Sequence, residues 1–296
     1  MKDFTIFGDS TCDLTEEYRS EAGIEYLEMK FSIDDREYSA DLDWKEMSPK
    51  EFYDTMRSGK RITTTQVPME TFERKFTDAI TAGKDILYIS CSSALSKSVN
   101  AGMVAARELM EKYPETRIRI VDSLESSFGQ GLMLLKAAAL RKEGKSVDET
   151  ADIMEAEKLT YQQCGTVEKL DYLKRAGRVT ASSAFFGNII GIKPIIISDA
   201  LGQNYAIKKV KGAGAAKEAV VQYVAENIVD SENQYIYLAH ADAKETAEAY
   251  SRLITEKINC KGTVYGNIGP IVGASVGPGT IICYFVGKSI DIKGEA

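Results

Sequence analysis

The feature that most constrains the fold is an alternation of strand-like and helix-like segments through the first half of the chain. Residues 4–7 and 85–89 are short apolar runs of strand length. Between them, Phe72 and Phe76 follow the four-residue spacing of one helix face. Strands that alternate with helices imply right-handed crossovers and a mostly parallel sheet. We therefore expect an α/β fold.

Local signals place several of the helices. Ser48 and Glu51 form a capping box around Pro49 at the first helical position, and Gly59 is expected to end that helix. The periodicity predicts further helices over residues 94–112, 132–142, 213–228 and 244–258.

The second half of the chain has a more mixed pattern. Residues 193–198 and 203–210 flank a turn and are typical of a β-hairpin. The pattern breaks near residues 160–165, and a length of 296 residues accommodates two domains. We predict an N-terminal α/β lobe over residues 1–160 with a mostly parallel sheet. A mixed α/β lobe should follow over residues 161–296.

Charge and cysteine content exclude several classes of protein. The formal net charge is −7, so the chain repels phosphate backbones, and we expect no nucleic-acid partner. The five cysteines are scattered without a C-x-x-C pair, which indicates a reducing compartment and predicts a cytoplasmic protein. His240 is the only histidine, so a site built from several imidazoles is excluded.

One uncharged segment, residues 262–287, is long enough to span a bilayer. It contains Pro270, Pro278 and several glycines, which a spanning helix tolerates poorly. We predict instead two strands, residues 263–268 and 280–286, on either side of a glycine-rich turn, and no integral membrane insertion.

Hydroxyl-bearing loops follow the predicted strands of the first lobe. In an open α/β sheet, ligands bind beyond the carboxyl ends of the strands. Each loop by itself is explained by helix capping. Together, hydroxyls beside helix N-termini indicate an anion site without fixed positive charge. These loops are residues 9–14, 63–66, 90–98 and 122–123.

Several short motifs extend the pattern over the whole chain. They are Asp9-Ser10-Thr11-Cys12-Asp13-Leu14, Thr64-Thr65-Gln66, Ser92-Ser93-Ala94-Leu95-Ser96, Asp122-Ser123, residues 170–179 (LDYLKRAGRV), Ile192-Lys193-Pro194-Ile195 and Gly277-Pro278-Gly279. In order and spacing they resemble the motifs of the DegV family of bacterial fatty-acid-binding proteins, which includes the FakB-type subunits of fatty acid kinase.

This resemblance implies a function and a ligand. Two α/β lobes would bury a long-chain fatty acid such as palmitate, stearate or oleate, with no other cofactor and no metal. The protein would be a carrier without turnover of its own. In the kinase-associated branch of the family, a partner fatty acid kinase phosphorylates the carboxyl group of the bound acid.

The resemblance also implies the residues that bind the carboxylate. These are Thr64 and Ser96, with Ser93 nearby. Ser275 stands where the family usually has a histidine, so a contact that could be cationic becomes a neutral hydroxyl. The residues that could support the site are Thr65, Lys97 and Arg178.

Burial of the acyl chain would supply most of the affinity. At about 0.8 kcal/mol per buried methylene, a chain of about fifteen contributes a gross ~12 kcal/mol before association costs. Candidate walls are Phe185, Phe186, Ile189 and Ile190, for which an ordinary helix core is an equally good interpretation.

The alternative function is a serine hydrolase or esterase, because residues 273–277 spell G-x-S-x-G around Ser275. A nucleophile elbow must lead from a strand into a helix, and residues 277–279 (GPG) would break a helix. His240 also precedes the serine instead of following it. A nucleotide site at residues 144–146 (GKS) lacks the first glycine of a P-loop.

Overall fold

A computed structural model describes residues 2–180 and 191–294. In this structure the chain divides into two compact units. The first unit comprises Met1–Glu46 and Ile62–Lys158, and the second comprises Met47–Arg61 and Leu159–Ala296. From the sequence we expect one boundary, after residue 160. The structure differs because residues 47–61 group with the second unit.

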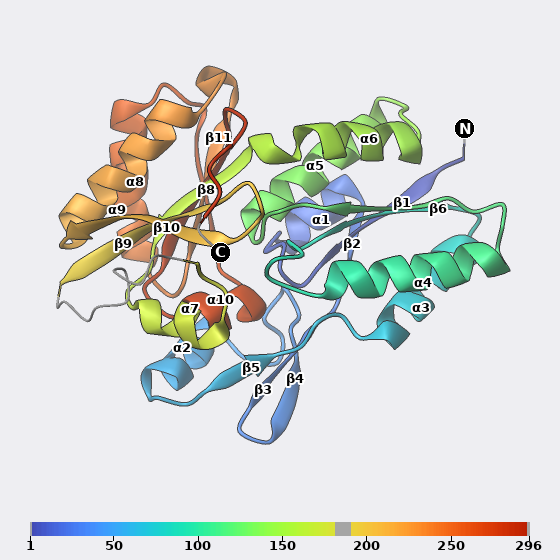
Figure 1. The fold of residues 1–296 in the computed structure, drawn as a ribbon, viewed down its shortest axis with the longest axis horizontal. Helices are drawn as coiled ribbons and strands as arrows, with labels where there is room; N and C mark the ends of the chain where they lie inside the picture. The colour runs from blue at the N-terminus through green and yellow to red at the C-terminus, as the bar shows by residue number, and fades with distance from the viewer. Residues whose placement is uncertain (1, 181–190, 295–296) are drawn as a thin grey trace. The chain divides into compact units, whose positions relative to one another are not determined.

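A parallel four-stranded sheet forms the centre of the first unit, as predicted (Figure 1). Its strand order is β2-β1-β6-β7. Every residue of β1 and β6 is buried, as expected for parallel strands covered on both faces. The strands are β1 (Phe4–Asp9), β2 (Ile24–Leu27), β6 (Asp85–Ser90) and β7 (Ile118–Asp122).

Two pairs of helices cover this sheet, α3 and α4 on one face and α5 and α6 on the other (Figure 1). Phe76 of α3 packs its ring 5.5 Å from that of Phe7, and Phe72 packs 5.4 Å from Tyr88. The helices of the unit are α1 (Glu16–Ala22), α3 (Met69–Thr81), α4 (Ser98–Lys112), α5 (Phe128–Lys142) and α6 (Val147–Glu157), followed by a 3₁₀ turn at Lys158–Thr160.

Two predicted helix starts were wrong. Helix α4 begins at Ser98 and not at residue 94, because the backbone N–H groups of Leu95 and Ser96 both donate to Ser92 O and close a turn there. Helix α5 begins at Phe128, four residues before the predicted start.

A small antiparallel sheet, in the order β4-β3-β5, completes the first unit. Its strands are β3 (Lys30–Ile33), β4 (Arg36–Ser39) and β5 (Ile62–Thr64). Phe31 on β3 pairs with Thr64, so the last residue of β5 is held in register.

A mixed six-stranded sheet in the order β10-β9-β8-β13-β11-β12 forms the second unit, again as predicted. Only β11 and β12 pair in parallel. The predicted hairpin is confirmed as the antiparallel pair β9–β10. The strands are β8 (Tyr161–Thr166), β9 (Ile192–Ser198), β10 (Asn204–Lys211), β11 (Tyr235–His240), β12 (Gly262–Asn267) and β13 (Ile281–Val286).

Helices α8 and α9 pack on one face of this sheet (Figure 1). Their core contains Val220, Val224, Ile236, Leu238 and Ile254. Helix α10 contacts α7 and α2. Helix α2 begins at the predicted capping box of Ser48 and Glu51. The helices are α2 (Pro49–Arg57), α7 (Leu170–Ala176), α8 (Ala213–Asn227), α9 (Lys244–Lys257) and α10 (Pro270–Val276), with a 3₁₀ turn at Ser231–Asn233.

The glycine-rich connection near the C-terminus was predicted as a turn, and this was wrong. It contains α10, and β12 and β13 are not neighbours because β11 lies between them. Within the described residues, no helix combines the length and the apolar character needed to cross a bilayer.

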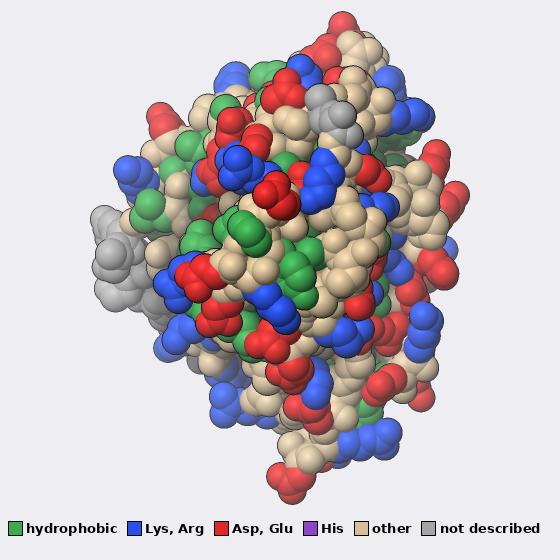
Figure 2. All heavy atoms as spheres, turned by 90° about the vertical axis from the view of Figure 1, so that its right-hand side faces the viewer, with side chains coloured by type: hydrophobic (Ala, Val, Ile, Leu, Met, Phe, Trp, Pro, Cys, Tyr) green, Lys and Arg blue, Asp and Glu red, His purple; other side chains and the backbone are tan. Residues whose placement is uncertain are grey.

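Acidic and basic side chains are interspersed on the face drawn in Figure 2. A surface of mixed sign offers no continuous cationic field to a phosphate backbone.

Candidate functional site

Asp9, at the carboxyl end of β1, is a buried anchor for the loops of the first unit. Its Oδ1 accepts hydrogen bonds from Thr11 N at 3.0 Å and Thr11 Oγ1 at 2.5 Å. Its Oδ2 accepts from Tyr88 Oη at 2.8 Å and Cys91 N at 3.0 Å. Burial, together with this carboxylate, raises the pKa of Tyr88 well above its usual value. The fully bonded carboxylate therefore positions the neighbouring loops.

The loop after Thr64 and the loop before α4 are tied together by side chains. Ser98 Oγ accepts the backbone N–H of Val67 at 3.1 Å. Ser96 Oγ accepts the N–H of Ser98 at 3.2 Å and lies 3.0 Å from Ser98 Oγ. Ser96 therefore lies in a loop that shares a hydrogen-bonded junction with the loop directly after Thr64, the last residue of β5, and both residues are half-buried.

Asp122, at the end of β7, orients the loop that contains Ser93. Its Oδ1 accepts the N–H of Ser93 at 3.0 Å and that of Leu124 at 3.2 Å. Ser93 and Lys97 are exposed, and Lys97 immediately precedes the first turn of α4. Thr65 is also exposed, and its N–H donates to Lys30 O at 2.9 Å.

Packing within the second unit explains the glycines on either side of Ser275. A Cβ on Gly273 would overlap the Tyr53 hydroxyl, which donates to Ile268 O at 2.7 Å. Gly277 has a φ of +78°, and a Cβ there would overlap the ring of Tyr172. The glycines of G-x-S-x-G thus permit close packing of α10 and need no catalytic explanation.

Ser275 itself lies within helix α10 and is half-buried. In a nucleophile elbow, the serine occupies a sharp turn between a strand and the following helix. Here Ser275 is the sixth residue of α10, well past residues 268–269, which connect β12 to this helix. Thr280 Oγ1 lies 3.1 Å from Val276 O and 2.9 Å from Gly277 O, and so bonds the carbonyls at the helix end.

His240 ends β11 and is almost fully buried, and its Nδ1 accepts the N–H of Ala243 at 3.4 Å. Burial lowers the pKa of this imidazole from its ordinary value. These contacts fit the interpretation of His240 as a structural residue at a strand end.

Arg178 is an exposed residue that follows α7 in the second unit. Its guanidinium donates to Ala176 O, and its own backbone carbonyl accepts from Asn204 Nδ2 at 2.9 Å. Thus Arg178 and Ser275 belong to the second unit. The other predicted site residues, which are Thr64, Thr65, Ser93, Ser96 and Lys97, belong to the first.

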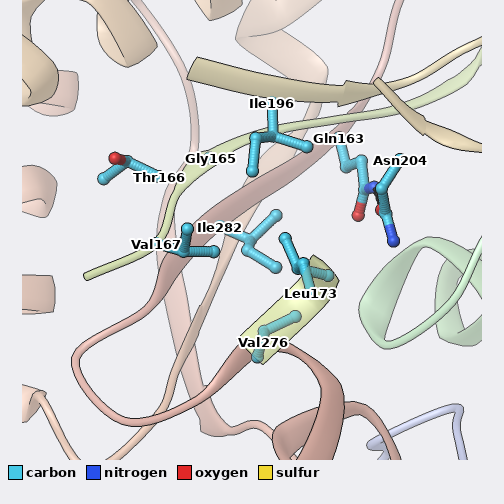
Figure 3. A pocket seen from close by; sticks show the side chains of 9 residues that line it. All are labelled: Gln163, Gly165, Thr166, Val167, Leu173, Ile196, Asn204, Val276 and Ile282. Carbon is cyan, nitrogen blue, oxygen red and sulfur yellow. Dashed lines mark hydrogen bonds between the residues drawn. The ribbon is translucent and has the colours of Figure 1, made fainter. Parts of the chain in front are cut away.

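A small hollow of about 20 Å³ lies in the second unit (Figure 3). This volume accommodates about one water-sized group. The candidate walls at residues 185, 186, 189 and 190 lie outside the described residues. The side chains that line the hollow come from six elements and one loop and are Gln163, Thr166, Val167, Leu173, Ile196, Asn204, Val276 and Ile282.

Sequence reasoning missed this hollow, since its residues are scattered from β8 to β13. The available signal was the pair of polar residues Gln162 and Gln163 in a strand that is buried throughout. In the part of the chain that the structure describes, no group of three His, Cys, Asp or Glu side chains is arranged to hold a metal ion.

These features define an α/β protein with hydroxyl-bearing loops at the carboxyl edge of a parallel sheet and an apolar hollow in a second, mixed unit. Residues 3–287 match the family model described as an uncharacterised protein of the DegV family. The chain belongs to the DegV family.

Other proteins of the same extent are similar to this chain in sequence or in fold. A DegV domain-containing protein of Clostridium perfringens is 37% identical over 98% of this chain and 99% of its own. The solved structure of a fatty-acid-binding DegV family protein from Thermus thermophilus is 25% identical, with a TM-score of 0.86 over 97% of this chain and all of its own. A stearic-acid-binding protein from Eubacterium ventriosum is 21% identical, with a TM-score of 0.84 over 97% and 99% of the two chains.

Proposed function

We infer that this protein binds a long-chain fatty acid such as palmitate, stearate or oleate. The observation that carries this proposal is the junction of Val67, Ser98 and Ser96, which ties the Thr64 loop to the Ser96 loop. Neutral donors on two such loops suit a single carboxylate. The family relationship adds support, since the relatives from T. thermophilus and E. ventriosum are described as binding fatty acids.

The carboxylate contacts in this proposal are Thr64 and Ser96, with Ser93 and Ser275 as further hydroxyl donors. Hydrogen bonds from neutral hydroxyls are weaker than charge-assisted pairs. The head group therefore fixes orientation, and the alkyl chain supplies most of the binding free energy. The supporting residues are Thr65, Lys97 and Arg178.

The alkyl chain would use the apolar side of the second unit. Val167, Leu173 and Ile282 line the hollow there and offer aliphatic contact. The hollow alone holds a group the size of one methylene or water, so it is one part of the acyl site in this proposal.

The protein would act as a carrier that presents the carboxyl group to a partner fatty acid kinase, and the phosphoryl transfer would belong to that partner. All five cysteines are free thiols, which suits the cytoplasm as the proposed location.

Native mass spectrometry of the recombinant protein, followed by organic extraction, tests this function. We expect a co-purified acyl species, or a mass shift on addition of palmitate or oleate. Thr64→Ala and Ser96→Ala should each weaken binding about tenfold, the loss of one good hydrogen bond to a charged group.

Thr63→Ala is a matched control, because neighbouring strand residues point to opposite faces of the sheet. It should leave the affinity unchanged. Recovery of no acyl species, with no shift on adding either acid, would contradict the proposal.

A further inference from the structure

Gln163 places a polar amide within the mostly apolar lining of the hollow in the second unit. Its side chain is on β8 and the residue is only 3% exposed. Leu173 and Ile282 line the same hollow, and Figure 3 shows them beside the Gln163 and Asn204 side chains. The Oε1 atom of Gln163 is fully buried and has no hydrogen-bond partner among the described residues. Such an atom is costly to bury unless something donates to it.

The orientation of this amide is determined by its neighbours. Asn204 Nδ2 donates to the backbone carbonyl of Arg178 at 2.9 Å, so Asn204 Oδ1 is left to accept. Gln163 Nε2 donates to that oxygen at 2.8 Å. If either side-chain amide were rotated by 180°, two acceptors or two donors would face each other. The polar atom of Gln163 that is left without a partner is therefore the oxygen Oε1, which can accept a hydrogen bond but cannot donate one.

We propose that Gln163 Oε1 selects an acyl chain that carries a hydroxyl group, so that the preferred ligand class is a hydroxy fatty acid. This deepens the proposed function and depends on it. A plain alkyl chain beside Gln163 would leave the buried oxygen without a donor, whereas a hydroxyl would satisfy it. The apolar neighbours would hold the methylenes on either side.

The same geometry separates a hydroxyl from a carbonyl. A keto group at the same carbon has similar size and polarity, but it only accepts hydrogen bonds. It would face the oxygen of Gln163 as a second acceptor. The site should therefore discriminate against an oxo fatty acid more strongly than against an unsubstituted one.

Competitive native mass spectrometry on the full chain tests this selection. The ligands are stearate and a positional series of hydroxystearates with the matching oxostearates. For at least one position, we expect the hydroxy acid to bind about tenfold more tightly than stearate, and the oxo acid to bind more weakly than stearate. This comparison uses the unmodified protein and does not depend on how a variant folds.

Two variants then assign the preference to Gln163. Gln163→Leu should abolish the preference for the hydroxy acid. In this variant, stearate should gain affinity relative to the hydroxy acid. Gln222→Leu makes the same chemical change at an exposed position of α8 and should leave the preference intact.

The results separate this inference from the function on which it rests. Stearate binding more tightly than every hydroxy isomer would overturn it and indicate that water satisfies Gln163. Equal binding of the hydroxy and oxo acids would overturn it too. If the protein bound none of the acids, the proposed function itself would fail.

Discussion

The side chain of Ser98 accepts the backbone N–H of Val67 at 3.1 Å, and this one bond joins the start of α4 to the loop that follows β5. Both residues are fully or almost fully buried. Because Thr64 directly precedes one of these loops and Ser96 lies in the other, we expect the bond to couple the stability of the first unit to the geometry of the proposed carboxylate site.

Replacement of Ser98 by alanine tests that coupling. Ser98→Ala leaves the buried N–H of Val67 without its acceptor, which costs about 1–3 kcal/mol. We expect a lower free energy of unfolding in urea and weaker fatty-acid binding. Ser20→Ala, at an exposed position of α1, is the control and should change neither quantity. Unchanged affinity in Ser98→Ala would show that the junction does not position the site.

Asp9→Asn should destabilise the first unit. The groups that donate to the Asp9 carboxylate belong to Thr11, Tyr88 and Cys91. The side-chain NH₂ of the new asparagine would place a donor opposite one of these donors. We expect a loss of about 2–4 kcal/mol, since hydrogen bonds to a charged group are lost and a buried donor is left unpaired. Denaturant unfolding measures this loss.

Asp34→Asn is the matched control for that change. Asp34 is exposed and has a φ of +53°, a conformation that asparagine tolerates well. The denaturant midpoint of the Asp34→Asn variant should equal that of the parent protein. Equal midpoints for the two variants would mean that the Asp9 network contributes little stability.

Gly273→Ala and Gly277→Ala should each destabilise the second unit. The added methyl group meets the Tyr53 hydroxyl in the first case and the Tyr172 ring in the second. Overpacking of this kind typically costs about 1–3 kcal/mol, and the positive φ of Gly277 adds strain. Thermal unfolding followed by circular dichroism should show lower midpoints.

Gly214→Ala provides the contrast, because it lies in α8 and a Cβ there has no neighbour within 4 Å. Alanine favours the helix by about 0.5–1 kcal/mol over glycine, so this variant should equal or exceed the parent in stability. A similar loss in all three variants would contradict the packing explanation of residues 273–277.

The position of Ser275 within a helix also predicts its reactivity. A fluorophosphonate probe should not label Ser275, because its hydroxyl lies within a helix and not at a strand-to-helix turn. Intact-protein mass spectrometry measures the adduct. Labelling that Ser275→Ala removes, accompanied by ester turnover, would favour the hydrolase over the carrier.

The single imidazole makes a pH prediction possible. Burial lowers the pKa of His240 in the folded protein below that of the unfolded chain, so the unfolded state binds the proton more readily. The contribution of His240 is therefore fully present above about pH 6.5 and is lost as the pH falls from there towards the folded-state pKa.

Urea unfolding of the parent and of His240→Asn across that range measures the effect. The stability difference between the two proteins should shrink as the pH falls. A difference that stays constant from pH 7 to pH 5 would show that His240 does not titrate differently in the folded and unfolded states.

Strong local signals predicted much of the secondary structure. The capping box of Ser48 and Glu51, the turn at residues 199–202 and the spacing of Phe72 and Phe76 all lie where the structure has α2, the β9–β10 hairpin and α3. Such features depend on residues a few positions apart. Helix α10 escaped prediction because Gly273 within it, and Gly269, Gly277 and Pro278 beside it, disfavour a helix in isolation. Contacts with Tyr53 and Tyr172, far away in sequence, outweigh that preference.

The sequence by itself determined the alternation of strands and helices, the helix caps and the hydroxyl loops, because each is a property of neighbouring residues. Only the tertiary structure decided that residues 47–61 join the second unit, that Ser98 ties two loops together, and that Asn204 fixes the orientation of the Gln163 amide beside a hollow. These outcomes depend on close packing and on the pairing of buried donors with acceptors. Such interactions join residues tens to hundreds of positions apart, and no local pattern records them.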